Sequence, residues 1–302
     1  QDGGFNDAIV PFHQRADAFR KRLVEAEPAQ IAALLEFAGR AYRRPLNDRE
    51  SADLRGLYRR LRDEQISHDE AFRLTLAKIL VASPFLYRLE SVPAGSSSAA
   101  ISDWELASRL SYFLWSSQPD AALRAAAASG TLSHPEVLER QTRRMLKEAR
   151  IRRLGTEFGC QWLHIHDFPV TESKSQQLFP EFADLRGDMY EESILFLTDL
   201  FQKDASLLNL LNADHTFVNE RMAKFYGVAG IQGNAWRRID GIKQQGRGGI
   251  LGLSTILAKQ SGASRTSPIL RGNWVSEVLL GEKLPRPPKN VPQLADTVPA
   301  GL

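Results

Sequence analysis

The chain has 302 residues, with 39 lysine and arginine residues against 36 aspartate and glutamate residues, a net charge of +3. Hydrophobic residues make up 43% and charged residues 25%, a globular balance that excludes a mainly disordered chain or a fibrous repeat. The length predicts about two domains. The basic residues are spread along the chain with acids close by, unlike the basic stripe of a nucleic-acid protein, and no window approaches the ~18 apolar residues of a transmembrane segment. We therefore expect neither a nucleic-acid partner nor a transmembrane segment.

The first 90 residues predict three amphipathic helices. Pro28 stands at a favourable early helical position, and apolar residues follow it at the spacing of one buried face: Ile31, Leu34, Leu35 and Ala38. After a break at 43–45, Asn47 can cap a second helix. Ser67 and Glu70 form a capping-box pattern that opens a third helix. This region is therefore expected to form one helical unit that ends near residue 90.

A second run of helices is expected beyond the uncharged, turn-rich linker 91–100. Ser102 can cap the first of them, and Ser133 with Glu136 repeats the capping-box pattern. Further helices are expected at about 150–164, 182–202, 216–226, 247–260 and 268–280. The last has Ser267 as its cap and Pro268 in its first turn. Residues 236–239 alone show a faint strand pattern.

The chain becomes proline-rich and loses its helical period from Leu284 onward. The predicted fold class is therefore all-α, a two-part multi-helix array with a proline-rich C-terminal strap. The expected domains are an N-terminal helical domain at 1–92, a larger helical domain at 100–283, and an extended tail or linker at 284–302.

His164 and His166 form the nearest approach to a metal or haem ligand set. Because Trp162 continues a helical pattern that Pro169 ends, both histidines are expected at a helix C-terminus, where the helix dipole favours a partly protonated imidazole. This capping role is preferred over metal coordination, and no metal site is predicted. The single cysteine, Cys160, is expected to pack in the core.

Three arginines, Arg247, Arg265 and Arg271, precede or open predicted helices. Guanidinium groups beside the free N–H groups of a helix start would suit a phosphate, a haem propionate or a partner's carboxylate. The alternative, which we favour from the sequence alone, is an arginine network that satisfies carbonyl groups between helices. Nucleotide-binding glycine motifs do not occur in the sequence. Among the acidic residues, the pair Glu191 and Glu192 is expected on the solvated face of a helix, although the apolar neighbours of Glu192 could draw it partly inward.

Several segments resemble a multidomain family known from planctomycetes and related bacteria. These segments are 37–46, 79–87, 107–117, 179–182, 216–221 with 226–227, 247–249, 265–268, 271–272 and 290–292. They follow the family's order and span most of residues 30–292. The family is built from domains of unknown function and is commonly accompanied by c-type cytochrome modules.

The resemblance implies a periplasmic or extracellular helical module of a cytochrome-c-associated redox protein. Such a module would position a haem domain or an electron-transfer partner. The family commonly has a Cys-x-x-Cys-His motif after Asn290-Val-Pro292, which this sequence lacks. We therefore expect no covalently bound haem in this chain, and a possible haem c carried by a missing segment, a c-type cytochrome domain or a separate subunit.

If such a haem lies against this chain, the residues themselves supply candidate contacts. Arg247, Arg265 and Arg271 are the candidates for its propionates, and His164 or His166 is the candidate axial ligand. Two other functions remain open. One is an enzyme that acts on a polysaccharide-like substrate through acids such as Glu192 or Asp214. The other is a structural assembly subunit, which would be an oligomer.

Overall fold

The computed structural model describes residues 3–90 and 100–285, with side chains from residue 13 onward. The described chain is helical apart from one two-stranded sheet, which confirms the predicted all-α class. Backbone contacts group it into two compact units, Gln1–Arg143 and Arg144–Leu302. None of the described helices has the length and apolar character needed to span a bilayer.

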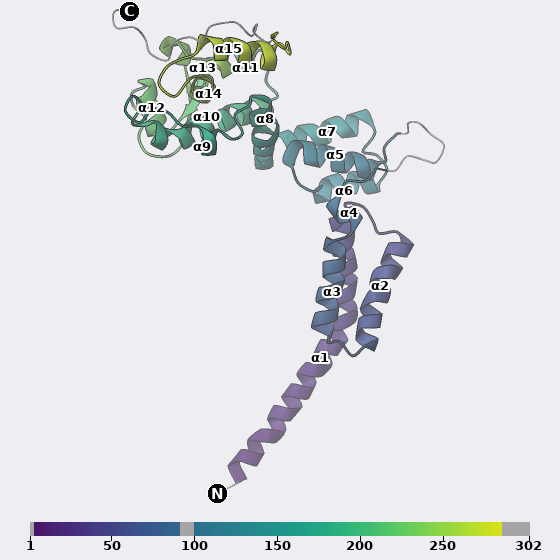
Figure 1. Cartoon of the computed structure of the whole chain (residues 1–302). Helices are drawn as coiled ribbons and strands as arrows, with labels where there is room; N and C mark the ends of the chain where they lie inside the picture. The colour runs from purple at the N-terminus through teal and green to yellow at the C-terminus, as the bar shows by residue number, and fades with distance from the viewer. Residues whose placement is uncertain (1–2, 91–99, 286–302) are drawn as a thin grey trace, which may run out of the picture. The chain divides into compact units, whose positions relative to one another are not determined.

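Three helices pack side by side at the start of the N-terminal unit (Figure 1). They are α1 (Gly3–Ala41), α2 (Asp48–Asp63) and α3 (His68–Leu80), followed by the single turn α4 (Ser83–Leu86). Asn47 caps α2 in a complete capping box with Glu50, and the Ser67 hydroxyl accepts from the Glu70 backbone at the start of α3. Both predicted caps are confirmed.

The C-terminal half of α1 supplies most of the core of these three helices. Its apolar face packs with Leu54 of α2 and Ile79 of α3, and the α1 members are those predicted from their spacing: Ile31, Leu34, Leu35 and Ala38. The expected helix start at Pro28 is wrong, because α1 begins at Gly3 and continues through this proline. A proline removes only one hydrogen-bond donor, and the packed turns that follow keep the helix intact.

The N-terminal unit continues with α5 (Asp103–Trp115), α6 (Ala121–Ala128) and α7 (Pro135–Leu146). Ser102 caps α5 in a capping box with Glu105, as predicted. The carboxylate of Asp103 accepts from the backbone N–H groups of Leu132 and Ser133, at 2.8 and 3.1 Å. This contact fixes the segment before α7 to the first turn of α5.

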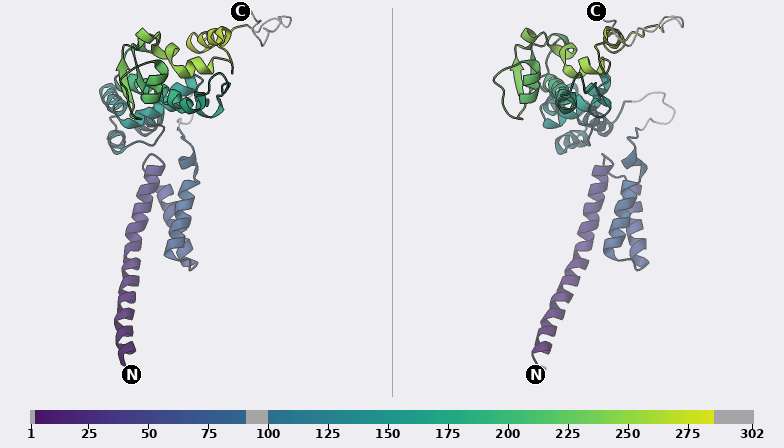
Figure 2. Two further views of the ribbon diagram at one scale, coloured as in Figure 1. Left: turned by 90° about the vertical axis from the view of Figure 1, so that its left-hand side faces the viewer. Right: turned by 60° about the vertical axis from the view of Figure 1, so that its left-hand side comes forward.

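The C-terminal unit is arranged around α10 (Phe182–Gln202), which the shorter elements surround (Figures 1 and 2). Its bounds are those predicted. The other helices are α8 (Cys160–Trp162), α9 (Phe168–Thr171), α11 (Asn209–Asn212), α12 (Glu220–Tyr226), α13 (Gly249–Gly252), α14 (Ser254–Lys259) and α15 (Pro268–Trp274). Tighter or wider turns occupy Ala149–Ile151, Leu154–Gly159, Ile242–Gln245 and Val275–Leu279. The buried faces of these elements form one core with α10.

The helix expected at 216–226 is wrong in its first part. Residues His215–Val218 form β1, which pairs antiparallel with β2 (Arg237–Asp240), so that His215 lies opposite Asp240. Thr216 and Val218 are buried and their neighbours are half-buried, the alternation of a strand. The faint strand signal at 236–239 is thus confirmed within one residue, but its partner was not predicted.

Two other expected helices are interrupted. The region 150–164 contains a π-helical turn at Leu154–Gly159, where Gly155 and Gly159 lie directly against α10. The region 247–260 is divided into α13 and α14 at Leu253. Ser267 caps α15 through the Leu270 backbone N–H, with Pro268 in the first turn, as predicted.

The predicted domain bounds 1–92, 100–283 and 284–302 stay predictions. Residues 91–99 of the expected linker lie outside the described residues, as do residues 286–302 of the expected strap.

Candidate functional site: an arginine-lined pocket beside a buried glutamate

The three candidate arginines meet at one pocket of about 240 Å³ in the C-terminal unit. Arg247, Arg265 and Arg271 all line it, together with Lys174. Its apolar lining comes from Phe179, Phe182, Leu185, Met189, Phe225, Leu257 and Ala258. Glu181 also lines it, so the pocket combines a mainly positive lining with an apolar interior.

Arg271, on α15, lies half-buried at this pocket. One of its guanidinium nitrogens donates to the Ser261 hydroxyl at 3.3 Å. Its Nε is buried and has no hydrogen-bond partner among the described residues. A buried N–H group without an acceptor is costly, and a ligand oxygen would satisfy it.

Arg247 connects the pocket to the interior of the unit. Its guanidinium lies 4.0 Å from the centre of the Tyr226 ring, within the range of a cation–π interaction. It also donates to the Gly252 carbonyl at 3.0 Å, so the predicted carbonyl-satisfying role is found for this arginine. The guanidinium is therefore held in place and still lines the pocket.

The Gly248–Gly249 turn explains why Arg247 occupies this place. Gly249 has φ +56°, and a Cβ there would lie 2.5 Å from the Leu211 carbonyl oxygen. Gly248 has φ +145°, and a Cβ there would lie 2.7 Å from the Ala213 carbonyl oxygen. Only glycine combines these dihedrals with so close an approach to a neighbouring backbone.

Lys174 is paired within the protein at the edge of the pocket. Its ammonium contacts the Glu172 carboxylate at 2.5 Å and donates to the Ser261 carbonyl at 3.1 Å. The side chain is nearly buried, so this pair fixes segment 172–174 against residue 261. We therefore assign Lys174 a structural role at the edge of the pocket.

Glu192 lies in the middle of α10 and is 1% exposed. Three hydroxyl groups donate to its carboxylate: Thr216 at 2.6 Å, Tyr226 at 2.6 Å and Ser254 at 3.1 Å. Ser254 also lines the pocket, and the Tyr226 hydroxyl lies 2.9 Å from the Ser254 Oγ. The expected solvated position is therefore wrong for Glu192, which is drawn fully inward, and its partner Ser254 connects it to the pocket.

Burial raises the pKa of Glu192, while the three hydroxyl donors and nearby Arg247 act in the opposite direction. Burial also raises the pKa of Tyr226 well above its usual value, so this phenol keeps its proton. An acid with a perturbed pKa beside a pocket is a common mark of a functional site.

The arginine pocket can bind an acidic group. Its volume is below the ~300–1,000 Å³ of sites that enclose a whole small molecule. Its size suits one carboxylate-bearing arm of a ligand better than a whole small molecule. Arginine forms planar, two-point contacts with such a carboxylate.

His164 and His166 do not line the arginine pocket. Both are exposed and alternate with buried Leu163 and Ile165. His164 follows the C-terminus of α8 with φ +59°, which agrees with the expected position after a helix. Their roles as axial haem ligands stay predictions. Within the described ranges there is no cluster of three His, Cys, Asp or Glu residues able to hold a metal.

Cys160 is fully buried in the core, as predicted. Burial raises the pKa of its thiol to about 11. A thiol with so high a pKa is unreactive near neutral pH. Cys160 is therefore a packing residue.

Glu192 and Asp214 do not form an acid pair. Asp214 is exposed, accepts from the Lys243 backbone N–H at 2.8 Å, and lines a different hollow from the one that Glu192 lines. A pair of acids flanking one substrate would be needed for glycoside hydrolysis. The geometry of these two residues does not support the enzyme alternative.

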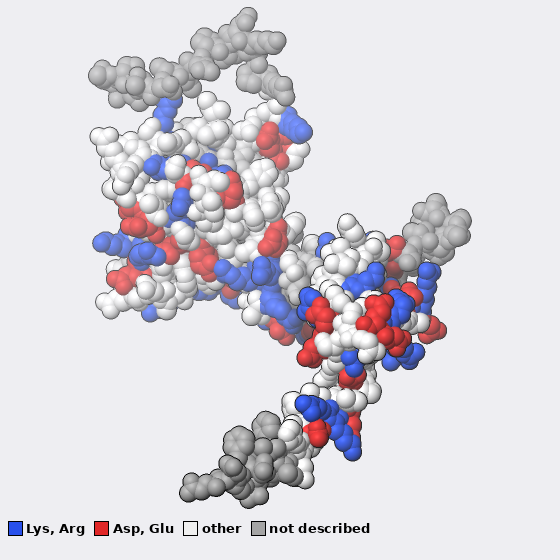
Figure 3. All heavy atoms as spheres, turned by 60° about the horizontal axis from the view of Figure 1, so that its bottom comes forward, with Lys and Arg blue, Asp and Glu red and all other residues white. Residues whose placement is uncertain are grey.

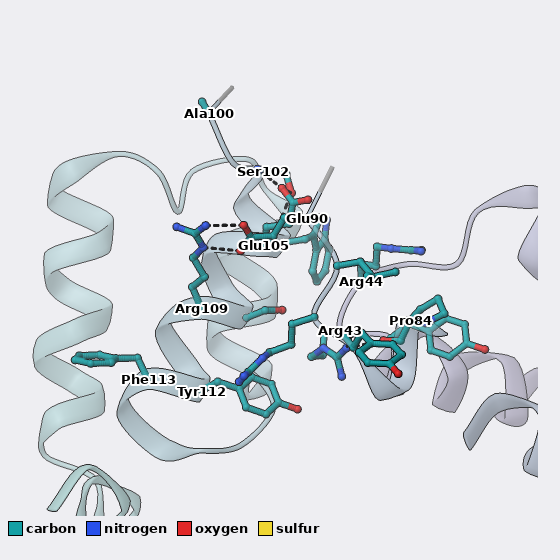
Figure 4. A pocket seen from close by; sticks show the side chains of 16 residues that line it. Arg43, Arg44, Pro84, Glu90, Ala100, Ser102, Glu105, Arg109, Tyr112 and Phe113 are labelled. Atoms are coloured by element: carbon teal, nitrogen blue, oxygen red, sulfur yellow. Dashed lines mark hydrogen bonds and ion pairs between the residues drawn. The ribbon is translucent and has the colours of Figure 1, made fainter. Parts of the chain in front are cut away.

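The N-terminal unit has its own hollow of about 1040 Å³ (Figure 4). Arg43 is 6% exposed and donates to the carbonyls of Pro84 and Tyr87, at 2.5 and 2.8 Å. Arg109 forms a two-point ion pair with Glu90 across the hollow (Figure 4). Both guanidinium groups already have acceptors within the protein, so we assign no ligand to this hollow.

Lys and Arg side chains are interspersed with Asp and Glu on the face drawn in Figure 3. Many of these charges form local pairs, such as Arg73 with Glu70 and Arg143 with Glu139. Exposed pairs of this kind contribute little stability. The arginine pocket differs because its guanidinium groups meet over an apolar interior.

Comparison with family models defines the class of protein. Residues 31–90 match PSD5, protein of unknown function (DUF1595), and residues 101–228 match PSD4, protein of unknown function (DUF1592). Residues 247–301 match PSCyt3, protein of unknown function (DUF1588). The chain is thus a helical multidomain protein, and it belongs to the family that combines these domains, as the resemblance predicted. Searches of curated proteins and of solved structures gave no match.

The sequence alone did not identify the other members of the site. Lys174, Thr216 and Ser254 were not predicted as site residues, nor was Tyr226 outside its family motif. No shared sequence signal marks them, since Lys174 lies in a polar run and Ser254 is followed by Thr255. Only the fold shows that Thr216, Tyr226 and Ser254 surround Glu192.

Proposed function

We propose that this chain is an extracytoplasmic helical module of a cytochrome-c-associated redox protein. In this role the arginine-lined pocket holds an acidic group of a haem-bearing domain or electron-transfer partner. The haem c is carried by that partner or by a further segment, and this chain positions it. The observation that carries the proposal is the convergence of Arg247, Arg265 and Arg271 on one apolar pocket.

The fit between pocket and group supports this function. A propionate is a carboxylate on a short apolar arm at the edge of a large apolar ring. The pocket offers guanidinium groups and the unpartnered Nε of Arg271 to the carboxylate, and apolar side chains to the arm. The short name of the model that matches residues 247–301, PSCyt3, agrees with a cytochrome context.

A titration with a haem c-peptide, a proteolytic fragment that presents both propionates, tests the proposal. The Soret band is followed as the full chain is added, at low and at physiological salt. We expect saturable binding that Arg265→Ala with Arg271→Ala weakens at least about tenfold, since each lost charge-assisted hydrogen bond costs about 1.5–3 kcal/mol. Salt should also weaken it.

The matched control is Arg237→Ala, which removes an exposed arginine of β2 outside the pocket. It changes the net charge of the unit and leaves the pocket intact. Equal weakening by Arg237→Ala would show that only net charge matters. No spectral change with the wild-type chain would remove the haem contact altogether.

A further inference from the structure

Two residues belong to both the arginine pocket and the Glu192 network. Ser254 lines the pocket and donates to the Glu192 carboxylate at 3.1 Å. Arg247 lines the pocket and also the small inner hollow that Glu192 lines. The guanidinium of Arg247 stacks on the ring of Tyr226, whose hydroxyl donates to Glu192. Ser254, Arg247 and Tyr226 therefore connect Glu192 to the pocket.

The charges of Glu192, Arg247 and an anion in the pocket influence one another. In a poorly solvated interior the interaction between two charges is much stronger than in water. An ionised Glu192 offsets the positive charge of Arg247 and repels an anion in the pocket. When Glu192 is protonated, the positive charge of Arg247 is not offset and attracts an anion in the pocket more strongly.

We propose that anion binding in the arginine pocket is coupled to the protonation of Glu192, so that the pocket binds an organic anion more tightly when this carboxyl group carries a proton. This inference rests on the pocket of the proposed function and adds its regulation. Glu192 touches no ligand and acts through Arg247 and Ser254, as a positioning residue. By linkage, the bound anion must favour uptake of one proton by Glu192 to the same extent.

The sign of the pH effect follows from the groups that face Glu192. Burial raises the pKa of Glu192, so its proton is lost above the ordinary glutamate range, and anion affinity must fall as pH rises through that value. Tyr226 keeps its proton, and arginine stays charged throughout. His215, from β1, lines the same inner hollow. Burial lowers its pKa, so its charge can also change with pH. Glu181, which lines the arginine pocket itself, is a further ionisable group.

Calorimetric titration with hexanesulfonate tests the coupling, because this anion has a short apolar chain and stays ionised at every pH used. The full wild-type chain is titrated between about pH 5 and pH 9, in two buffers with different heats of ionisation. We expect affinity to fall about five- to tenfold across Glu192's titration, with net proton uptake on binding. This measurement needs no variant.

The same titration of the Glu192→Gln variant is the second measurement. This variant keeps a side chain of the same shape without a titrating group, so the pocket should bind hexanesulfonate with the high affinity at every pH and take up no proton. His215→Asn is the matched control and should retain both the pH dependence and the uptake. Neutral hexanol should show neither.

Three results would overturn the coupling: wild-type binding without proton uptake, uptake that survives in Glu192→Gln but is lost in His215→Asn, or no hexanesulfonate binding at any pH. The proposed function is judged separately, by the haem c-peptide and the Arg265 and Arg271 variants. Arginine-dependent haem binding without proton uptake would keep that function and remove only the coupling.

Discussion

Glu50 in the N-terminal unit and Glu192 in the C-terminal unit are both held by several hydrogen bonds, but their surroundings differ. Glu50 accepts two bonds from Arg44, both at 2.8 Å, and one from the Asn47 backbone at the start of α2. These contacts lower the pKa of Glu50. Glu192 has only hydroxyl donors, and burial raises its pKa. Glu50 stabilises the start of α2. Glu192 lies beside a pocket in surroundings that disfavour its charged form.

Two glycines with positive φ, one from each unit, also differ in their surroundings. Gly130, after α6, has φ +66° with open space where a Cβ would stand. Gly249 has a similar φ, but a Cβ there would lie within 2.6 Å of two backbone carbonyl oxygens. Gly130 thus only ends a helix, as Gly227 does after α12. Gly249 instead allows the backbone next to Arg247 to pack closely against its neighbours.

Gly249→Ala should have the largest effect on stability. It combines a strained dihedral with contacts of 2.5–2.6 Å to backbone oxygens that cannot move away, so we expect a loss of about 3 kcal/mol or more. Gly130→Ala is the matched control, with a cost of about 1 kcal/mol from the left-handed conformation alone. Chemical denaturation of both variants measures the difference, and equal costs would contradict the close packing at Gly249.

Glu192→Leu should cost about 2–4 kcal/mol. It removes the acceptor for Thr216, Tyr226 and Ser254 without leaving a large cavity, and their buried hydroxyl groups lose a partner. Near-UV circular dichroism and thermal unfolding of the full chain report the change. A stability equal to the wild type would show that the hydroxyl groups do not depend on this carboxylate.

Asn47→Ala should cost about 1 kcal/mol, the usual loss for an N-terminal cap. The side chain accepts from the Glu50 backbone N–H at 2.8 Å, and the alanine variant leaves that group to water. Because the cap lies in the N-terminal unit, hexanesulfonate binding should not change. A changed affinity would mean that the two units are coupled.

The two glutamates should give small pH trends of opposite sign. The lowered pKa of Glu50 adds stability above its ordinary value of 4.5 that is lost as pH falls. The raised pKa of Glu192 adds stability at low pH that is lost as pH rises above 4.5. Unfolding free energies of Glu50→Gln and Glu192→Gln, each measured against the wild type from about pH 2.5 to pH 8, give the two slopes. Slopes of equal sign would contradict one of the two assignments.

Much of the fold could be predicted from local sequence. Asn47, Ser102 and Ser267 cap helices where their patterns indicated, because capping depends on residues within one turn. The long helix α10 has the predicted bounds. The strand β1 was missed because four residues carry little periodic signal and its partner lies about 20 residues further on.

The site was predictable only in part. The three arginines were chosen one by one from their places before helices, whereas Glu192 was expected on a solvated face, with its apolar neighbours as the only sign of an inward position. Their meeting depends on how α15 and the Gly248–Gly249 turn pack against α10, which no local pattern contains. The hydroxyl groups of Thr216 and Ser254 had no distinguishing signal until the fold brought them to Glu192.

The most direct test of the central claim is the composition of the native particle, from the intact mass and haem stain of material purified without strong salt. The account predicts that a haem-bearing chain or segment stays with this protein, shows a Soret band, and is released when Arg265 and Arg271 are replaced by alanine. A particle that contains this chain with no porphyrin, or one whose haem partner is retained equally by the double variant, would contradict it.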